Sequence, residues 1–217
     1  MRKPEQGEGL SAPFVTFEGI EGSGKTTQLR LLSEHLRRKG VPHRTTREPG
    51  GTPLADEIRR LLLSFREEGI FPEAELLLYE AARAQHVRAV ILPALASGEA
   101  VLCDRFFDAS SVYQGFSRGI GEGRIEDLNA FASAGLVPDL TFLLDVDPET
   151  GFARLRGRGT GPDRMESESI AFHRKVREGY LRLQEANPAR ITRIDARPSA
   201  EEVFRLVREA ARAQLGW

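Results

Sequence analysis

The stretch that decides the fold is GIEGSGKT at residues 19–26, which matches the pattern G-x-x-x-x-G-K-[ST]. Its glycines let backbone N–H groups curl around phosphate oxygens, and the dipole of a following helix favours the anion. We expect Lys25 to neutralise phosphate charge and Thr26 to ligate Mg²⁺. The motif therefore predicts a loop that binds ATP or GTP. The residues expected at this nucleotide are Gly19, Ile20, Glu21, Gly22, Ser23, Gly24, Lys25, Thr26 and Thr27.

The motif stands between an apolar run that ends in glycine, residues 13–19, and a stretch with leucines at helical spacing, residues 25–39. Short apolar runs and amphipathic stretches then alternate along the chain. This alternation predicts an α/β fold, with a five-stranded parallel sheet and helices on both faces. The further strands are expected within 41–51, 99–106, 139–146 and 189–196, and further helices at 53–64 and 72–97.

Composition limits the domain count and the partners. With 217 residues the chain fits one domain, expected at 13–217 after a disordered polar tail at 1–12. The 31 basic and 32 acidic residues nearly balance, so we expect no nucleic-acid polymer as partner. The single cysteine, Cys103, excludes an internal disulfide and is expected as a buried strand thiol. Because we find no signal-peptide core and no run of 18 apolar residues, we expect a cytoplasmic protein without membrane contact.

Among the proteins that share this phosphate-binding loop, a small kinase fits the sequence best. A regulatory GTPase would need the strings Asn-Lys-x-Asp and Asp-x-x-Gly, and neither occurs. A mechanical ATPase usually carries a glutamate next to the acidic end of a strand, whereas Arg105 follows Asp104 here. Phosphoryl transfer needs cations around both the donor and the acceptor phosphate. The many arginines of the chain can supply them.

Several segments together resemble the thymidylate kinase family, across about residues 14–206. The resemblance implies an enzyme that transfers the γ-phosphoryl group of ATP to dTMP for dTTP synthesis, uses Mg²⁺ and forms a homodimer. The segments read FEGIEGSGKTTQ (17–28), REPGGT (47–52), AARAQ (81–85), DRF (104–106), SSVYQG (110–115), PDLTFLLDV (138–146) and PDR (162–164).

The same resemblance implies roles for individual residues. It places Asp104 near Mg²⁺, as a metal ligand beside Thr26, and Arg105 on the acceptor phosphate. Both count as catalytic, together with Lys25. Glu21 is implied at the 3′-hydroxyl of the sugar. The residues implied at dTMP are Glu21, Arg47, Pro49, Tyr79, Arg83, Arg105, Ser110, Tyr113 and Gln114.

Within that set, the helix at 72–97 is expected to recognise the base. Tyr79 is implied to stack on thymine, and Arg83, four residues later on the same helical face, to hydrogen-bond it. Tyr113 is implied beneath the sugar, where a 2′-hydroxyl would point. Pro49 is implied in a rigid turn that the family often builds around a cis bond.

An arginine-rich segment at about 151–164 resembles the lid of the family. One subgroup of the family carries an arginine directly after the acid of the phosphate-binding loop, and here that position is Gly22. The transition-state cation is therefore expected from the lid, and Arg158 or Arg164 is the residue we predict as catalytic. The lid arginines are Arg154, Arg156, Arg158 and Arg164.

Two alternatives remain open at this point. The chain could phosphorylate another pyrimidine nucleoside monophosphate, such as dUMP or UMP, because the acceptor pocket alone distinguishes these kinases. It could also be an inactive nucleotide-dependent regulatory module. The intact set of Lys25, Thr26, Asp104 and Arg105 argues against the second alternative.

Overall fold

The computed structural model describes residues 12–157 and 161–217. Apart from Ala12, the expected N-terminal tail at 1–12 lies outside these residues. In chain order the elements are β1 Phe14–Glu18, α1 Lys25–Arg38, β2 His43–Arg47, α2 Pro53–Leu63, α3 Pro72–His86, η1 Val87–Ile91, α4 Leu92–Ala96, β3 Ala100–Asp104, α5 Phe107–Ser110, η2 Ser111–Ser117, α6 Glu122–Ala132, β4 Leu140–Asp145, α7 Pro148–Arg156, α8 Ile170–Ala186, β5 Ile191–Asp195 and α9 Ala200–Leu215.

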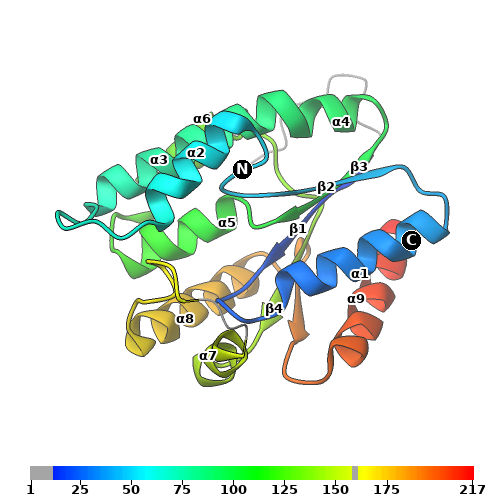
Figure 1. Cartoon of the computed structure of the whole chain (residues 1–217). Helices are drawn as coiled ribbons and strands as arrows, with labels where there is room; N and C mark the ends of the chain where they lie inside the picture. The colour runs from blue at the N-terminus through cyan, green and yellow to red at the C-terminus, as the bar shows by residue number, and fades with distance from the viewer. Residues whose placement is uncertain (1–11, 158–160) are drawn as a thin grey trace.

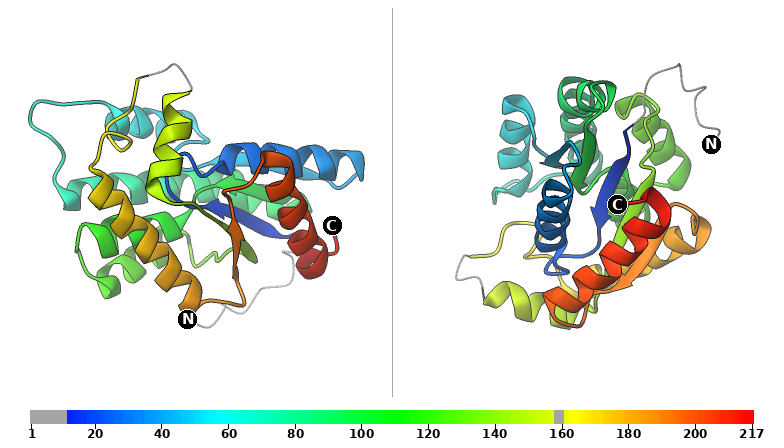
Figure 2. Two further views of the ribbon diagram at one scale, coloured as in Figure 1. Left: turned by 90° about the horizontal axis from the view of Figure 1, so that it is seen from below. Right: turned by 90° about the vertical axis from the view of Figure 1, so that its right-hand side faces the viewer.

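The five strands form one parallel sheet in the order β2-β3-β1-β4-β5, which confirms the predicted fold class. Helices α1 and α9 lie side by side on one face of the sheet, and α8 lies on the other (Figures 1 and 2). Because β1 is central, the loop that follows it leaves the middle of the sheet. In a parallel sheet this switch point is where ligands bind.

The central strands of the sheet are buried on both faces. All residues of β1 and β4 are buried, as expected for parallel strands that carry helices above and below. Phe17 on β1 and Phe142 on β4 contact each other across the sheet, with ring centroids 5.2 Å apart. Cys103 on β3 is fully buried, as the sequence predicts.

Local sequence fixes where the helices begin. The Thr52 side chain accepts a hydrogen bond from the Ala55 N–H and caps α2, directly after the REPGGT turn. Ser199 and Glu202 form a capping box at the start of α9. These caps fix the first residues of α2 and α9.

Two expected segments differ in detail from the structure. The long helix expected at 72–97 is divided into α3, the π-helical turn η1 and α4. The expected lid begins as regular helix, because α7 extends to Arg156. Among the described residues, no helix is long and apolar enough to span a membrane.

Candidate active site

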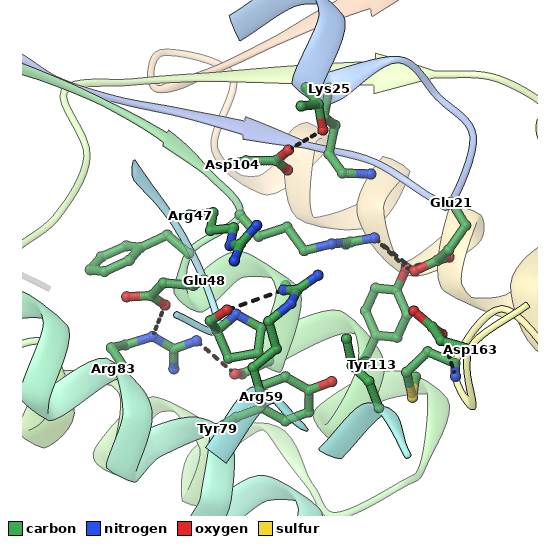
Figure 3. A pocket seen from close by; sticks show the side chains of 18 of the residues that line it. Glu21, Lys25, Arg47, Glu48, Arg59, Tyr79, Arg83, Asp104, Tyr113 and Asp163 are labelled. Atoms are coloured by element: carbon green, nitrogen blue, oxygen red, sulfur yellow. Dashed lines mark hydrogen bonds and ion pairs between the residues drawn. The ribbon is translucent and has the colours of Figure 1, made fainter. Parts of the chain in front are cut away.

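A cavity of about 410 Å³ opens at the carboxyl ends of β1, β2 and β3. The register of the sheet brings these ends together, because Asp104 pairs with both Arg47 and Phe17. Figure 3 shows Lys25 and Asp104 on one side of this cavity, and Tyr79 and Arg83 on the opposite side. The cavity therefore reaches from the phosphate-binding loop to α3.

The phosphate-binding loop holds its lysine tightly. Lys25 Nζ donates to the carbonyl oxygens of Gly19 and Ile20, at 3.1 and 2.8 Å. Burial and the nearby Arg105 charge lower the pKa of Lys25 to about 8. Next to it, the Thr26 hydroxyl donates to Asp104 Oδ2 at 2.6 Å. The two residues predicted at Mg²⁺ are thus in direct contact.

Arg105 lines the cavity. Its φ of 71° places it in the left-handed region, which turns the side chain away from the path of β3. Nη2 donates to Glu21 Oε1 at 2.8 Å and to the Tyr113 hydroxyl at 3.1 Å. Nη1 donates to the Tyr180 hydroxyl at 3.1 Å. These contacts hold the guanidinium beside the phosphate-binding loop.

Glu21 is the negative partner of this cation. The Tyr113 hydroxyl lies 2.8 Å from both of its carboxylate oxygens, and His173 Nδ1 lies 3.1 Å from Oε2. Burial alone would raise the pKa of Glu21, but the Arg105 charge and the His173 contact lower it to about 2. Glu21 is therefore ionised at neutral pH and can accept a hydrogen bond from a sugar hydroxyl.

Glu18, the last residue of β1, is a second buried carboxylate behind Arg105. Its oxygens accept from the Phe106 N–H and from the Tyr180 hydroxyl, both at 2.7 Å. Burial raises the pKa of Glu18 to about 7, although the Arg105 charge opposes this shift. The carboxylate thus fixes the backbone directly after Arg105.

The α3 end of the cavity carries the residues expected at the base. Tyr79 and Arg83 both line it, one helical turn apart. The buried Arg83 guanidinium donates hydrogen bonds to four side chains. Nε donates to Glu48 and Nη2 to Ser110. Nη1 donates to Glu80 Oε1 at 2.5 Å and to Asn129 Oδ1 at 2.9 Å.

Two arginines lie between the loop and the base end. Arg47 is the last residue of β2, and the peptide bond between Glu48 and Pro49, just beyond the strand, is cis. Arg59 on α2 donates to the Pro49 carbonyl oxygen at 3.1 Å and points into the cavity (Figure 3). Burial and the neighbouring Arg47 charge lower the pKa of Arg59. An anion between these cations would relieve their repulsion.

The lid arginines are not gathered at one place. Arg154 on α7 approaches the loop, with Nη1 3.5 Å from the Gly22 carbonyl oxygen. Arg164 bonds the Leu62 carbonyl oxygen through Nε and pairs with Glu75 at 2.6 Å, so its guanidinium points toward α2 and α3. Arg156 is exposed, and Arg158 lies outside the described residues.

The structure brings most of the predicted site residues to one cavity and adds others. Sequence reasoning missed Arg59, His173, Tyr180 and the role of Glu18. No sequence motif marks Arg59. Only the position of α2 in the folded chain shows that Arg59 lines the cavity. Predicted residues on the cavity wall are Glu21, Gly22, Lys25, Thr26, Arg47, Pro49, Tyr79, Arg83, Asp104, Arg105, Ser110, Tyr113 and Gln114.

Comparison with known proteins identifies the family. A family model described as thymidylate kinase matches residues 17–207. The chain belongs to the thymidylate kinase family. It is 50% identical over 207 residues to a thymidylate kinase of Geobacter sp. (strain M21), covering 93% of this chain and 92% of the relative. It is 52% identical over 198 residues to a thymidylate kinase of Gloeobacter violaceus, covering 91% and 93%.

A solved structure supports the same conclusion. The crystal structure of thymidylate kinase from Ehrlichia chaffeensis matches with a TM-score of 0.75 and 34% sequence identity. The match covers 92% of this chain and 98% of the other. The resemblance seen in the sequence is therefore confirmed for this member of the thymidylate kinase family.

The raised pKa of Glu18 predicts how stability depends on pH in this thymidylate kinase family member. The folded state binds the Glu18 proton more tightly than the unfolded state, whose pKa is about 4.5. Protonation of Glu18 therefore stabilises the folded state most below pH 4.5, and this stabilisation is lost as the pH rises to about 7. Relative to Glu18→Gln, the wild-type free energy of unfolding should fall by on the order of 2–3 kcal/mol across this window.

Denaturant unfolding at half-unit pH steps in both proteins measures this difference. Other titrating groups cancel in the comparison, because both proteins carry them. Parallel stability curves for the two proteins between pH 4.5 and 7 would show that Glu18 does not titrate in this range.

Proposed function

We propose that the chain transfers the γ-phosphoryl group of ATP to the 5′-phosphate of dTMP, giving dTDP and ADP for dTTP synthesis. The observation that carries the proposal is the single cavity that joins the phosphate-binding loop to the α3 pocket. Such a cavity can hold a donor and an acceptor with their phosphates together. The family and the relatives named thymidylate kinase support dTMP as the acceptor.

Three arginines support the placement of the acceptor phosphate. Arg47, Arg59 and Arg105 all line the cavity between Lys25 and Tyr79. A guanidinium can bind a phosphate through two parallel N–H donors, which fixes orientation as well as charge. We propose that these side chains hold the dTMP phosphate in line with the γ-phosphate on Lys25.

Mg²⁺ is the proposed cofactor, with Thr26 and Asp104 as its protein ligands. Both residues offer oxygen, the donor that Mg²⁺ prefers, and their contact at 2.6 Å supports a single ion within reach of both. Within residues 12–157 and 161–217, no group of three His, Cys, Asp or Glu residues could hold a metal. This fits an ion bound mainly by nucleotide phosphates and water. When bound, it would neutralise β- and γ-phosphate charge.

The chain's own residues then position the two substrates and stabilise the charge that develops during transfer. Phosphoryl transfer proceeds through charge on the transferred oxygens, so fixed cations are more effective than mobile ones. Lys25 is the donor-side cation, and Arg105 is the acceptor-side cation held by Glu21. We propose that Glu21 also accepts from the sugar 3′-hydroxyl. Tyr113, which contacts Glu21 and Arg105, would close the space of a 2′-hydroxyl.

We also propose a homodimer. Helices α2, α3 and α6 lie next to one another and expose large apolar side chains, which a second copy could cover (Figure 1). A shallow groove between α2 and α3 adds apolar surface there. The exposed large apolar residues of these three helices are Leu54, Leu61, Leu77 and Phe131.

We further expect a cytoplasmic location, where both nucleotides are available.

The first test of the function uses Lys25→Ala. The substitution removes the cation beside the β- and γ-phosphates and leaves the loop glycines unchanged. We expect kcat/KM for dTMP to fall at least about a hundredfold. ADP and dTDP are measured with Mg·ATP and a panel of dTMP, dUMP, UMP and dCMP. A folded variant with turnover within a few-fold of wild type would refute the loop assignment, and a wild type inactive on dTMP would refute the proposed function.

A matched pair of variants tests the acceptor phosphate site. Arg59→Ala removes a cavity cation, whereas Arg60→Ala removes its neighbour, whose side chain is 76% exposed. Arg59→Ala should raise KM for dTMP at least about tenfold with little change in KM for ATP, because a charge-assisted bond contributes about 1.5–3 kcal/mol. Arg60→Ala should leave both constants near wild type. Equal constants in the two variants would place the acceptor phosphate elsewhere.

The lid cation is tested by single alanine substitutions of its arginines. We propose Arg158 as the catalytic one, on the sequence alone, and expect Arg158→Ala to lower turnover far more than ATP affinity. Arg154→Ala and Arg156→Ala should have smaller effects. Arg164→Ala should instead lower the melting temperature, because it leaves Glu75 and the Leu62 carbonyl oxygen without this partner. Wild-type turnover in all four variants would exclude the lid as the source of the cation.

A further inference from the structure

Glu75 is a buried carboxylate to which no role has been assigned so far. It is fully buried on α3, four residues before Tyr79 and eight before Arg83, so the three side chains share one helical face. Gln114 Nε2 donates to Glu75 Oε1 at 2.8 Å. Arg164 and Arg118 approach Oε2, with Nη2 atoms at 2.6 and 3.3 Å.

The charge of Glu75 fixes which way the Gln114 amide points. Burial alone would raise the pKa of Glu75, but the Gln114 hydrogen bond and the Arg118 and Arg164 charges lower it. An ionised carboxylate accepts hydrogen bonds and donates none, so the NH₂ group of Gln114 must face it. The carbonyl oxygen Oε1 of Gln114 is then turned away from Glu75. Gln114 lines the cavity, which this oxygen can therefore face.

Arg83 completes the pattern at this end of the cavity. Four of its five N–H donors bond described side chains, which leaves one N–H of Nη2. Because Arg83 and Gln114 both line the cavity, they can offer it this N–H donor and the Gln114 carbonyl acceptor. The edge of thymine or uracil matches this pair, with O4 as acceptor beside N3–H as donor. Cytosine reverses both, with a 4-amino donor beside an unprotonated N3.

We propose that Glu75 is a positioning residue for base selection, which holds the Gln114 carbonyl toward the pocket so that pyrimidines with an N3–H are accepted and cytosine is rejected. The inference rests on the proposed function, because it takes the base of the acceptor to lie against Tyr79. A site whose polar groups are fixed rejects the wrong partner by leaving buried groups unpaired.

Glu75→Gln tests the orientation directly. Arg164 at 2.6 Å and Arg118 Nη2 at 3.3 Å both require an oxygen at the Oε2 position, whereas Oε1 accepts from Gln114 at 2.8 Å and from Arg118 Nε at the longer distance of 3.3 Å. We therefore expect the new NH₂ group at the Oε1 position, where it faces Gln114. The Gln114 amide then has to turn over, which places its own NH₂ in the pocket. The ratio of kcat/KM for dTMP to kcat/KM for dCMP should fall at least about tenfold.

Arg118→Met is the matched control. It removes the Arg118 contacts with both oxygens of the same carboxylate and leaves Glu75, Gln114 and Arg164 unsubstituted. We expect its dTMP/dCMP ratio to stay within about threefold of wild type. If Glu75 merely neutralised the two arginines, Glu75→Gln would lower the stability and leave the ratio at its wild-type value, as in Arg118→Met.

A double-mutant cycle with Gln114→Met decides whether Glu75 acts through Gln114. Gln114→Met should lower the ratio by itself, and Glu75→Gln should lower it no further in that background. The proposal is overturned by a wild-type ratio in Glu75→Gln, or by an equal further fall in the Gln114→Met background. If Glu75→Gln does not fold, an unchanged ratio in Gln114→Met still overturns it.

The assay separates the two proposals. A wild-type protein that does not phosphorylate dTMP refutes the proposed function. A wild type that phosphorylates dTMP, together with a Glu75→Gln variant of unchanged ratio, refutes the role of Glu75 alone.

Discussion

The ion pair between Arg105 and Glu21 depends on a backbone conformation that arginine adopts reluctantly. A left-handed residue with a Cβ costs roughly 1–2 kcal/mol. Two hydrogen bonds from neighbouring N–H groups to β1 offset this cost, from Arg105 to the Phe17 carbonyl oxygen at 3.0 Å and from Phe106 to Glu18 at 2.7 Å. The central strand therefore does more than fill the core, because its last carboxylate holds the cation that faces the acceptor.

The same constraint organises the charges of the cavity. Glu21 partly neutralises Arg105, while Arg47 and Arg59 approach from β2 and α2, and Asp56 lies 3.5 Å from Arg47. Burial, and after it the Arg47 charge, lowers the pKa of Arg59. A doubly charged phosphate placed there replaces repulsion with attraction, so binding energy is gained where the acceptor must be held.

The sequence predicts the sheet, the loop and most of the cavity, because each depends on a short segment whose residues determine its local structure. GIEGSGKT needs only a strand before it and a helix after it, and REPGGT carries its own turn and helix cap. Arg59, His173 and Tyr180 belong to amphipathic helices whose sequences carry no functional motif. They reach the site because α2 crosses the open end of the sheet and α8 lies beneath Arg105, which no short motif encodes. The division of the long helix by η1 has one signal in the sequence, Pro93 in the first turn of α4, which lacks the N–H that a continuous helix needs.

The glycine after the acid of the phosphate-binding loop has a steric cause. A Cβ at Gly22 would lie 2.1 Å from the Gly151 carbonyl oxygen, and a Cβ at Gly151 would lie 2.5 Å from that of Glu21. The loop and the first turn of α7 therefore touch backbone to backbone, and no side chain fits at either position. An arginine at position 22 could not supply a catalytic cation without displacing α7. The same contact brings the arginines of α7 to the loop, with Arg154 against Gly22. Helix α7 therefore leaves no room for an arginine at position 22 and places its own arginines near the loop instead.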